Sequence, residues 1–323
     1  MELDEPPLAS VMPDEKVPLR GVESDNFFQS VLLSANSSGN MKVLVASEDC
    51  VHPGLDGILY VDEVLNKDCC NQLMFAIDSC AQLSFWSASG RENQDAKRFR
   101  NADTIEVHSK SFASLIWQRL SQNFGTWEIN IGANEDEDPR WERELPGVWR
   151  ATGVNEDMLF AVYPSGGNFA PHTDGRAVKD FNCRSFFSII LYLNSIPINE
   201  GGGTRFYHSD SLKSLHLDGL NQWTCDLSQV SYTIEAKAGR CLIFSQEMVH
   251  EGIPPDYPNC KYILRSDIMF SRTPAICSSD SDRKAYSNYL KGQNLAEKGL
   301  LSEALPLMKK AMKESSFELQ AFL

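Results

Sequence analysis

Basic residues are scarce in this chain of 323 residues. Lys and Arg together number 30 against 44 Asp and Glu, so the formal net charge at pH 7 is −14. A surface of this charge repels the phosphates of nucleic acids and of anionic lipids. The sequence has no basic cluster that would offset this charge locally. We therefore expect no nucleic-acid partner.

The sequence also lacks an apolar run long enough to span a membrane, and its acidic, proline-containing start has no apolar segment of signal-peptide length. None of its nine cysteines belongs to a CxxC pair. Without a secretory signal, reduced thiols are the simplest expectation. We expect a cytoplasmic or nuclear protein with no membrane association.

Composition along the chain indicates three parts. Residues 1–56 are expected to form an N-terminal extension that is partly disordered, with a strand in "MKVLVA". Residues 57–275 are expected to form the main domain, and residues 283–323 a helical hairpin. The hydrophobic content of the whole chain, 42%, is ordinary for a globular protein, so the chain can bury a sizeable core.

Two helices are expected in the first half of the main domain. The stretch "NKDCCNQLMFAID" predicts a helix that Asp62 or Asn66 caps, with apolar positions at Leu73, Phe75 and Ile77. A second helix is expected at residues 110–124. From residue 147 the pattern changes to short β-rich runs that Gly, Pro, Asn and Asp separate. These runs predict a sandwich or jelly roll over residues 147–272 rather than a parallel sheet.

Histidine is rare, with six residues, and three of the six stand two positions before an aspartate: His172, His208 and His216. Side chains two apart on a strand leave on the same face, so each pair could provide an imidazole and a carboxylate together. His250 lies 78 residues after His172, but only 42 after His208 and 34 after His216. Only the first separation leaves room for several intervening strands. The other two pairs lie in a polar loop, where solvated side chains are expected.

His250 follows the apolar run "RCLIFS", so a strand can carry its imidazole to the mouth of the barrel. Together with His172 and Asp174 it would make a set of two histidines and one carboxylate. This facial arrangement suits non-haem Fe(II) oxygenases because it leaves coordination positions open. We predict a metal site at these three residues.

Charged and polar side chains also alternate on the expected strands. In "KYILRSDIMF" the alternation sets Lys261 and Arg265 on one face, and in "SIILYLN" it sets Ser188 and Tyr192 on one face. A cation that points into a barrel is costly unless it meets an anion. A co-substrate carboxylate could be that anion, and the Tyr192 hydroxyl could share it.

Five motifs follow one another in the second half of the chain: "YPSGGNFAPHTDG", "RSFFSIILYLN", "GGGTRF", "AGRCLIFSQEMVHEGIP" and "KYILRSDIMF". Together they resemble the Fe(II)/2-oxoglutarate-dependent dioxygenases, close to the prolyl 4-hydroxylase group, over roughly residues 57–272. The resemblance implies an α+β fold in which a double-stranded β-helix (jelly roll) has flanking N-terminal helices.

The resemblance assigns Fe(II) to His172, Asp174 and His250. It implies that Lys261 holds the distal carboxylate of 2-oxoglutarate, and that Tyr192 and Tyr163 line the co-substrate pocket.

The position of Lys261 departs from the family in one respect. It lies 11 residues after His250, one more than is usual in prolyl hydroxylases, so Arg265 on the same strand face is a rival for the salt bridge. Thr204 and Arg205 of "GGGTRF" are expected to be structural or to lie on the substrate side.

The expected activity is hydroxylation of a C–H bond with O2 and 2-oxoglutarate as co-substrates and succinate and CO2 as products. A prolyl or other side chain of an intracellular protein is the first candidate substrate, and ascorbate is a candidate cofactor. Two alternatives remain open: the same chemistry on a small molecule, and a binding module without catalysis.

The tail resembles one tetratricopeptide unit, because small and apolar residues stand at its characteristic positions: Gly292, Leu295, Gly299, Ala304, Met308 and Ala311. Asn288, Lys291 and Ser316 depart from the pattern. Such repeats need about three copies to bury a core. We expect the tail to dock on the barrel, to bind a partner or to begin a longer array; an ordinary helical hairpin is the alternative.

Overall fold

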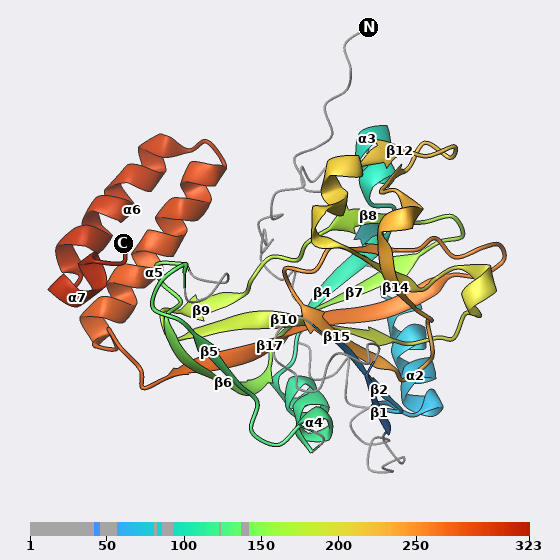
Figure 1. Ribbon diagram of the computed structural model, residues 1–323, viewed down its shortest axis with the longest axis horizontal. Helices are drawn as coiled ribbons and strands as arrows, with labels where there is room; N and C mark the ends of the chain where they lie inside the picture. Colours follow the sequence, from blue (N-terminus) through green and yellow to red (C-terminus); the bar gives the residue numbers. More distant parts are fainter. Residues whose placement is uncertain (1–41, 46–56, 81–82, 86–92, 123, 137–141) are drawn as a thin grey trace, which may run out of the picture. The chain divides into compact units, whose positions relative to one another are not determined.

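The computed structural model describes residues 42–45, 57–80, 83–85, 93–122, 124–136 and 142–323 (Figure 1). The chain divides into two compact units. The first combines the chain up to residue 125 with residues 153–175 and 187–268, and the second combines residues 126–152, 176–186 and 269–323. Most of the expected N-terminal extension lies outside the described residues, and the domain boundaries expected from the sequence stay a prediction.

The larger sheet of the first unit has the strand order β1-β2-β15-β10-β17-β7-β4-β3, and its neighbouring strands run antiparallel (Figure 1). The strands are β1 (Lys42–Val45), β2 (Ile58–Asp62), β3 (Ser84–Phe85), β4 (Asp103–His108), β7 (Asp157–Tyr163), β10 (Cys183–Tyr192), β15 (Cys241–Ser245) and β17 (Lys261–Thr273). The ends of β10 and β17 fall in the second unit, where β10 also pairs with β9 (Val178–Asp180).

A second antiparallel sheet has the order β14-β11-β16-β8. Its strands are β8 (Phe169–His172), β11 (Thr204–Tyr207), β14 (Val230–Ile234) and β16 (His250–Gly252). The chain between β11 and β14 carries two short 3-10 helices, Ser209–Ser214 and Leu227–Gln229, and the two-stranded pair β12 (His216–Leu217) and β13 (Trp223–Thr224). A third 3-10 helix, Ile198–Glu200, precedes β11.

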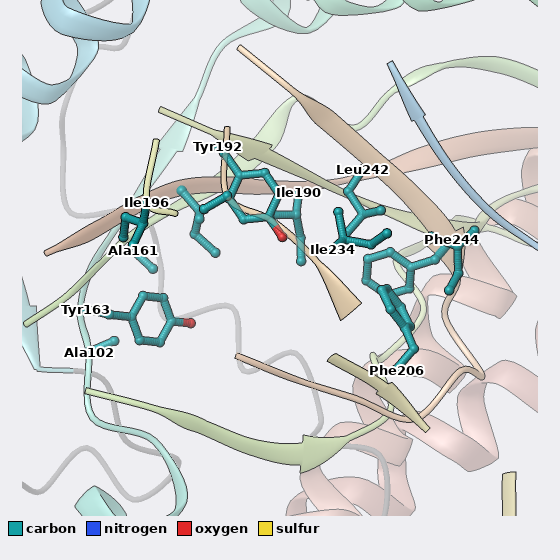
Figure 2. Close-up of a cluster of buried hydrophobic side chains, with 13 residues drawn as sticks. Ala102, Ala161, Tyr163, Ile190, Tyr192, Ile196, Phe206, Ile234, Leu242 and Phe244 are labelled. Carbon is teal, nitrogen blue, oxygen red and sulfur yellow. The ribbon is translucent and has the colours of Figure 1, made fainter. Parts of the chain in front are cut away.

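Apolar side chains from both sheets meet in one core. Ile190 and Tyr192 of β10 join Phe244 of β15 from the larger sheet, and Phe206 of β11 and Ile234 of β14 come from the smaller one (Figure 2). The rings of Phe206 and Phe244 meet edge to face, with centroids 5.1 Å apart. Two antiparallel sheets around a shared core, with added helices, confirm the mixed α+β class and are consistent with the expected jelly roll.

The helices of the first unit are α2 (Lys67–Asp78), α3 (Gln94–Phe99) and α4 (Lys110–Ser121). Asn66 is the N-cap of α2, since its side chain accepts a hydrogen bond from the Cys69 amide at 2.8 Å, whereas Asp62 accepts bonds from Lys237 and Arg240. The structure corrects the end of the second helix, since α4 ends at Ser121 rather than at residue 124. Of the apolar residues named in α2, Phe75 is 76% exposed because it points away from the buried face.

The second unit contains β5 (Glu128–Ile131), β6 (Gly147–Val154), whose last two residues belong to the first unit, and the helices α5 (Asp280–Glu297), α6 (Leu301–Glu314) and α7 (Phe317–Gln320). A helical hairpin is therefore present in the tail. Within it Gly292 lets α5 approach α6 closely, since a Cβ there would lie 2.8 Å from Met308 Cγ. Among the described residues, no helix combines the length and apolarity needed to cross a membrane.

A polar cluster within the second unit joins Tyr286 of α5 to Arg184 of β10 through Glu144, which lies in the turn before β6. Arg184 donates to a Glu144 carboxylate oxygen at 2.9 Å, and the Tyr286 hydroxyl donates to the same oxygen at 2.7 Å. Tyr286 is 1% exposed, so the carboxylate replaces water as the partner of both groups. Since one partner is charged, the Tyr286 bond is stronger than a neutral one.

We expect Tyr286→Phe to lower the free energy of unfolding by about 1.5–3 kcal/mol, because it removes a buried hydrogen bond to a charged group. Urea unfolding followed by circular dichroism measures the change. Tyr289→Phe is the matched control: its half-buried hydroxyl accepts one bond from the Gln293 amide, so the loss should stay below about 1 kcal/mol. Equal losses in the two variants would contradict this account of the cluster.

Candidate metal centre

Two histidines face each other across the second sheet. β8 and β16 pair so that His172 lies opposite His250, and the centroids of the two rings are 4.3 Å apart. Each ring uses Nδ1 to contact a backbone carbonyl two residues earlier, Ala170 at 2.7 Å and Met248 at 3.0 Å. These contacts set the orientation of both rings, so that Nε2 of each can bind a metal ion.

Asp174 completes the cluster just after β8. Its backbone amide donates to the Gln246 carbonyl at 3.0 Å, which holds the start of this loop against the end of β15. One carboxylate oxygen lies 3.7 Å from His172 Nε2, and the other lies 3.7 Å from His250 Nε2. The three donor atoms all lie within 4.8 Å of one another. The structure thus brings together the three residues that the sequence analysis chose as ligands.

The protonation states of the cluster suit a metal ion. Burial would raise the pKa of Asp174, but the charge of Arg265 and the neighbouring His250 and His172 hold it well below its usual range. Burial and the proximity of His172 lower the pKa of His250 to about 4. The carboxylate is therefore ionised and the His250 imidazole neutral at neutral pH, which are the forms that bind metals.

Two imidazoles and one carboxylate at these distances fit Fe(II). The carboxylate has further support from Ser188, whose hydroxyl donates to it at 2.5 Å. Ser188 and Tyr192 leave β10 on the same face, so both point to the interior, as the strand pattern indicated. The cluster therefore has the donor types, the charge and the supporting hydrogen bonds that a metal site of this kind needs.

Arg265 faces carboxylates of the chain itself. Its guanidinium lies 3.5 Å from Asp174 and 3.2 Å from Asp267. Asp267 is buried and also accepts hydrogen bonds from the Gln246 amide at 2.9 Å and the Asn155 amide at 3.2 Å. The positive charge of Arg265 is therefore matched within this network, beside the candidate ligands.

Lys261 is in a different environment. It is 2% exposed, and its ammonium donates to the Gly203 carbonyl at 2.8 Å and lies 5.3 Å and 5.7 Å from the ring centroids of Tyr163 and Tyr192. Burial lowers its pKa to about 7, and only the charge of Glu251 opposes this shift. Among the described residues, no carboxylate lies within ion-pair distance of this ammonium.

Tyr192, Tyr163 and Thr204 lie around the same interior space. The Tyr192 hydroxyl is 2.5 Å from Thr204 Oγ1, and both residues are buried. Figure 2 shows the hydroxyl groups of Tyr163 and Tyr192 directed into the space between the sheets. Thr204 thus supports a residue of the expected co-substrate pocket.

The three glycines of "GGGTRF" allow the backbone to pass close to neighbouring segments. Gly201 has a φ of +75°, and a Cβ there would lie 2.0 Å from the Pro254 carbonyl oxygen. At Gly203 a Cβ would lie 2.5 Å from the Ile234 carbonyl oxygen. Side chains at these positions would displace the strand that supplies the Gly203 carbonyl to Lys261.

Arg205 lies beside a surface pocket of about 390 Å³. It forms an ion pair with Glu251, which also accepts a hydrogen bond from Thr224 at 3.1 Å. The pocket extends to Phe169 and Gly252, and a Cβ at Gly252 would lie 3.6 Å from the Lys261 ammonium. The pocket is therefore close to the interior site.

Several residues around the site were not found from the sequence. Strand alternation puts Asp267 on the face of Arg265, but its bonds from Gln246 and Asn155 depend on contacts between distant segments and could not be recognised. Phe169, which stacks on His172, stands inside the quoted HxD motif but was assigned no role, and Arg100, which lies over the Phe169 ring, belongs to none of the five motifs. By contrast, His208 and His216 are exposed, as expected from their polar loop.

Comparison with known proteins gives a family for part of the chain. Residues 158–265 match the model of the 2OG-Fe(II) oxygenase superfamily. This range contains His172, Asp174, His250 and Lys261. No curated protein sequence is significantly similar to the chain.

Solved structures with detectable similarity include prolyl hydroxylases. One is a prolyl-4-hydroxylase from Pseudomonas putida, with 15% identity, a TM-score of 0.39, and coverage of 76% of this chain and 99% of that one. Another is a prolyl hydroxylase from Trichoplax adhaerens in complex with a hypoxia inducible factor peptide fragment, with 14% identity, a TM-score of 0.41, and coverage of 77% and 90%.

On the family match and the converging His-Asp-His cluster, we assign residues 158–265 to the 2OG-Fe(II) oxygenase superfamily.

Proposed function

We propose that this protein is an Fe(II)- and 2-oxoglutarate-dependent dioxygenase that hydroxylates a C–H bond of a prolyl side chain in another protein. The observation that supports it most is the convergence of His172, Asp174 and His250 within 4.8 Å in a buried site. The buried Lys261 supports the co-substrate: its ammonium donates to a backbone carbonyl, and no carboxylate of the described residues lies within ion-pair distance of it.

Each part of the site has a task in this proposal. His172, Asp174 and His250 would hold Fe(II), and Lys261 with Tyr192 and Tyr163 would hold 2-oxoglutarate. When bound, these two groups supply the oxidising chemistry that places one oxygen atom of O2 on the substrate and yields succinate and CO2. Ascorbate would be an accessory reductant.

The chain's own contribution is orientation and exclusion of water. Arg265 keeps the Asp174 carboxylate ionised, and the Ser188 hydroxyl holds it in place. Tyr192 and Thr204 hold each other in the apolar interior, where a charged co-substrate interacts strongly with Lys261 because the local dielectric is low. Since Arg265 is matched by Asp174 and Asp267, we favour Lys261 over Arg265 as the anchor.

The substrate side is the surface pocket beside Arg205 and Phe169, whose volume suits an inserted side chain. A protein substrate would present such a side chain from an extended segment. The tetratricopeptide-like tail is a further part of this proposal, as a surface that binds a partner.

The central test is succinate formation from 2-oxoglutarate with Fe(II) and a library of proline-containing peptides. We expect turnover with some peptides, together with the gain of one oxygen atom by mass spectrometry. His172→Ala and Asp174→Ala should lose both activity and metal affinity. His216→Ala, at an exposed histidine of a second HxD pair, is the matched control and should retain the metal affinity. If the double variant His172→Ala with Asp174→Ala retained its metal affinity, the assignment of these residues as metal ligands would be wrong.

Lys261→Met should raise the KM for 2-oxoglutarate about 100-fold, because loss of one partner of a buried ion pair costs about 2–5 kcal/mol and 1.4 kcal/mol corresponds to tenfold. Arg265→Met should instead weaken Fe(II) binding, because it removes the cation beside Asp174. Steady-state kinetics and metal titration separate the two effects. The reverse pattern would make Arg265 the anchor.

The pH dependence of co-substrate binding follows from Lys261. Because burial lowers its pKa to about 7, the ammonium loses its proton in the free protein as the pH rises above 7. A dianionic co-substrate needs the charged form, so the affinity for 2-oxoglutarate should fall by up to about tenfold per pH unit above pH 7. Lys261→Arg, whose guanidinium stays charged, should flatten the profile between pH 7 and 9. An equally steep profile in that variant would exclude Lys261 as the titrating group.

A further inference from the structure

Phe169 lies flat against a candidate metal ligand. Its ring stacks on the His172 imidazole with centroids 3.6 Å apart and an angle of 19° between the planes. The pairing of β8 with β16 is irregular here: Gly252 lies opposite Phe169 and His250 opposite His172, so β8 has one extra residue. Such a bulge re-aims a side chain. It explains how two residues three positions apart on β8 come to stack.

Arg100 lies over the same Phe169 ring. Its guanidinium carbon is 4.5 Å from the ring centroid, and the residue is 5% exposed. Because the imidazole covers one face of the ring at 3.6 Å, the opposite face remains for the guanidinium. The phenyl ring is thus held between a cation and a metal-binding imidazole.

The segment that carries Arg100 is fastened to the start of β8. Arg100 and Phe169 form an antiparallel bridge, and the Asn101 amide donates to the Asn168 carbonyl at 2.8 Å. The ring of Phe99 meets that of Phe169 edge to face, with centroids 5.7 Å apart. The position of the guanidinium relative to the ring is therefore set by both backbone and side-chain contacts.

Arg100 also reaches the expected co-substrate pocket. Its guanidinium lies close enough to the Tyr163 hydroxyl to lower the pKa of that hydroxyl, against the larger effect of burial, which raises it. Tyr163 lies in the interior cluster, with its ring 5.3 Å from the Lys261 ammonium. One buried cation therefore contacts both the ring that covers His172 and a hydroxyl near Lys261.

We propose that Arg100 is a positioning residue that sets the plane of the His172 imidazole through Phe169 and the direction of the Tyr163 hydroxyl. This inference rests on the proposed function, since it takes His172 as a ligand. The Nδ1 contact with Ala170 restrains one edge of the imidazole, and the Phe169 ring restrains its rotation. Without Arg100, the ring of Phe169 would lose the contact that keeps it against the histidine.

The test uses Co(II) as a probe in the full chain, because its visible spectrum reports the geometry of its ligands independently of turnover. We expect Arg100→Met to weaken Co(II) binding about tenfold, the scale of outer contacts to metal ligands, and to change the spectrum. Arg100→Lys, which keeps a cation over the ring, should give an intermediate affinity. The KM for 2-oxoglutarate should also rise in Arg100→Met, through Tyr163.

Arg98→Met is the matched control, since Arg98 lies two residues earlier and forms an ion pair with Asp95 at 3.1 Å. It should leave the Co(II) spectrum unchanged. Combining Arg100→Met with Phe169→Leu should weaken Co(II) binding by less than the product of the single effects, since the two residues act through one contact. Thermal unfolding confirms that each variant is folded.

Three results would overturn the inference: an unchanged Co(II) spectrum and affinity in Arg100→Met, fully multiplicative effects with Phe169→Leu, or an Arg100→Lys variant that is folded but no better than Arg100→Met. The proposed function fails separately. If the protein binds Co(II) through His172 but no substrate yields succinate, the proposal of hydroxylation is wrong and the Arg100 experiment still decides its own question.

Discussion

The antiparallel pairing of β8 with β16 is the constraint on which the candidate site depends. It places His172 opposite His250, and the loop after β8 then brings Asp174 to the same point. Side chains alternate strictly along strands, so a shift of one residue in this pairing would turn one imidazole to the other face. Neither histidine could then share an ion with the other.

The electrostatics of the site depend on which of two cations on β17, Arg265 and Lys261, has a carboxylate of the chain beside it. Arg265 lies between two carboxylates, Asp174 and Asp267, and thereby keeps a buried anion ionised. Lys261 is buried among tyrosines, and burial lowers its pKa to about 7 although its ammonium donates to a backbone carbonyl. The two cations stand four residues apart on one strand, but among the described residues only Arg265 is paired with carboxylates of the chain. An anion that enters the interior gains most from Lys261.

Much of the site could be predicted from the sequence because its determinants are local. An HxD pair before an apolar strand, and a histidine after another, identified two of the six histidines together with Asp174. Alternation on β10 and β17 correctly turned Ser188, Tyr192 and Lys261 inward. Asn66 caps its helix because the side chain and the amide it accepts from are three residues apart.

Other features depend on contacts between distant segments and gave no local signal. Asp267 stands on the same strand face as Arg265, but Asp174 comes from the loop after β8, so the full pairing of Arg265 could not be predicted from the sequence. Phe75 is apolar yet exposed, because position in the helical period outweighs residue type. The second unit joins three separate stretches of chain, which composition alone does not reveal. Arg100 contacts Phe169 only because the end of α3 lies against β8.

The place of β8 at the end of its sheet has a further consequence. Among the described residues, beyond the bridge between Arg100 and Phe169 at its start, β8 pairs with β16 alone, and a strand held by fewer backbone hydrogen bonds opens most readily. An ion that took one ligand from β8 and another from β16 would cross-link the two strands. Binding of the ion would then disfavour the local opening of β8, because the ion binds only the closed pair of strands. Metal binding and the folding of this edge would be thermodynamically coupled.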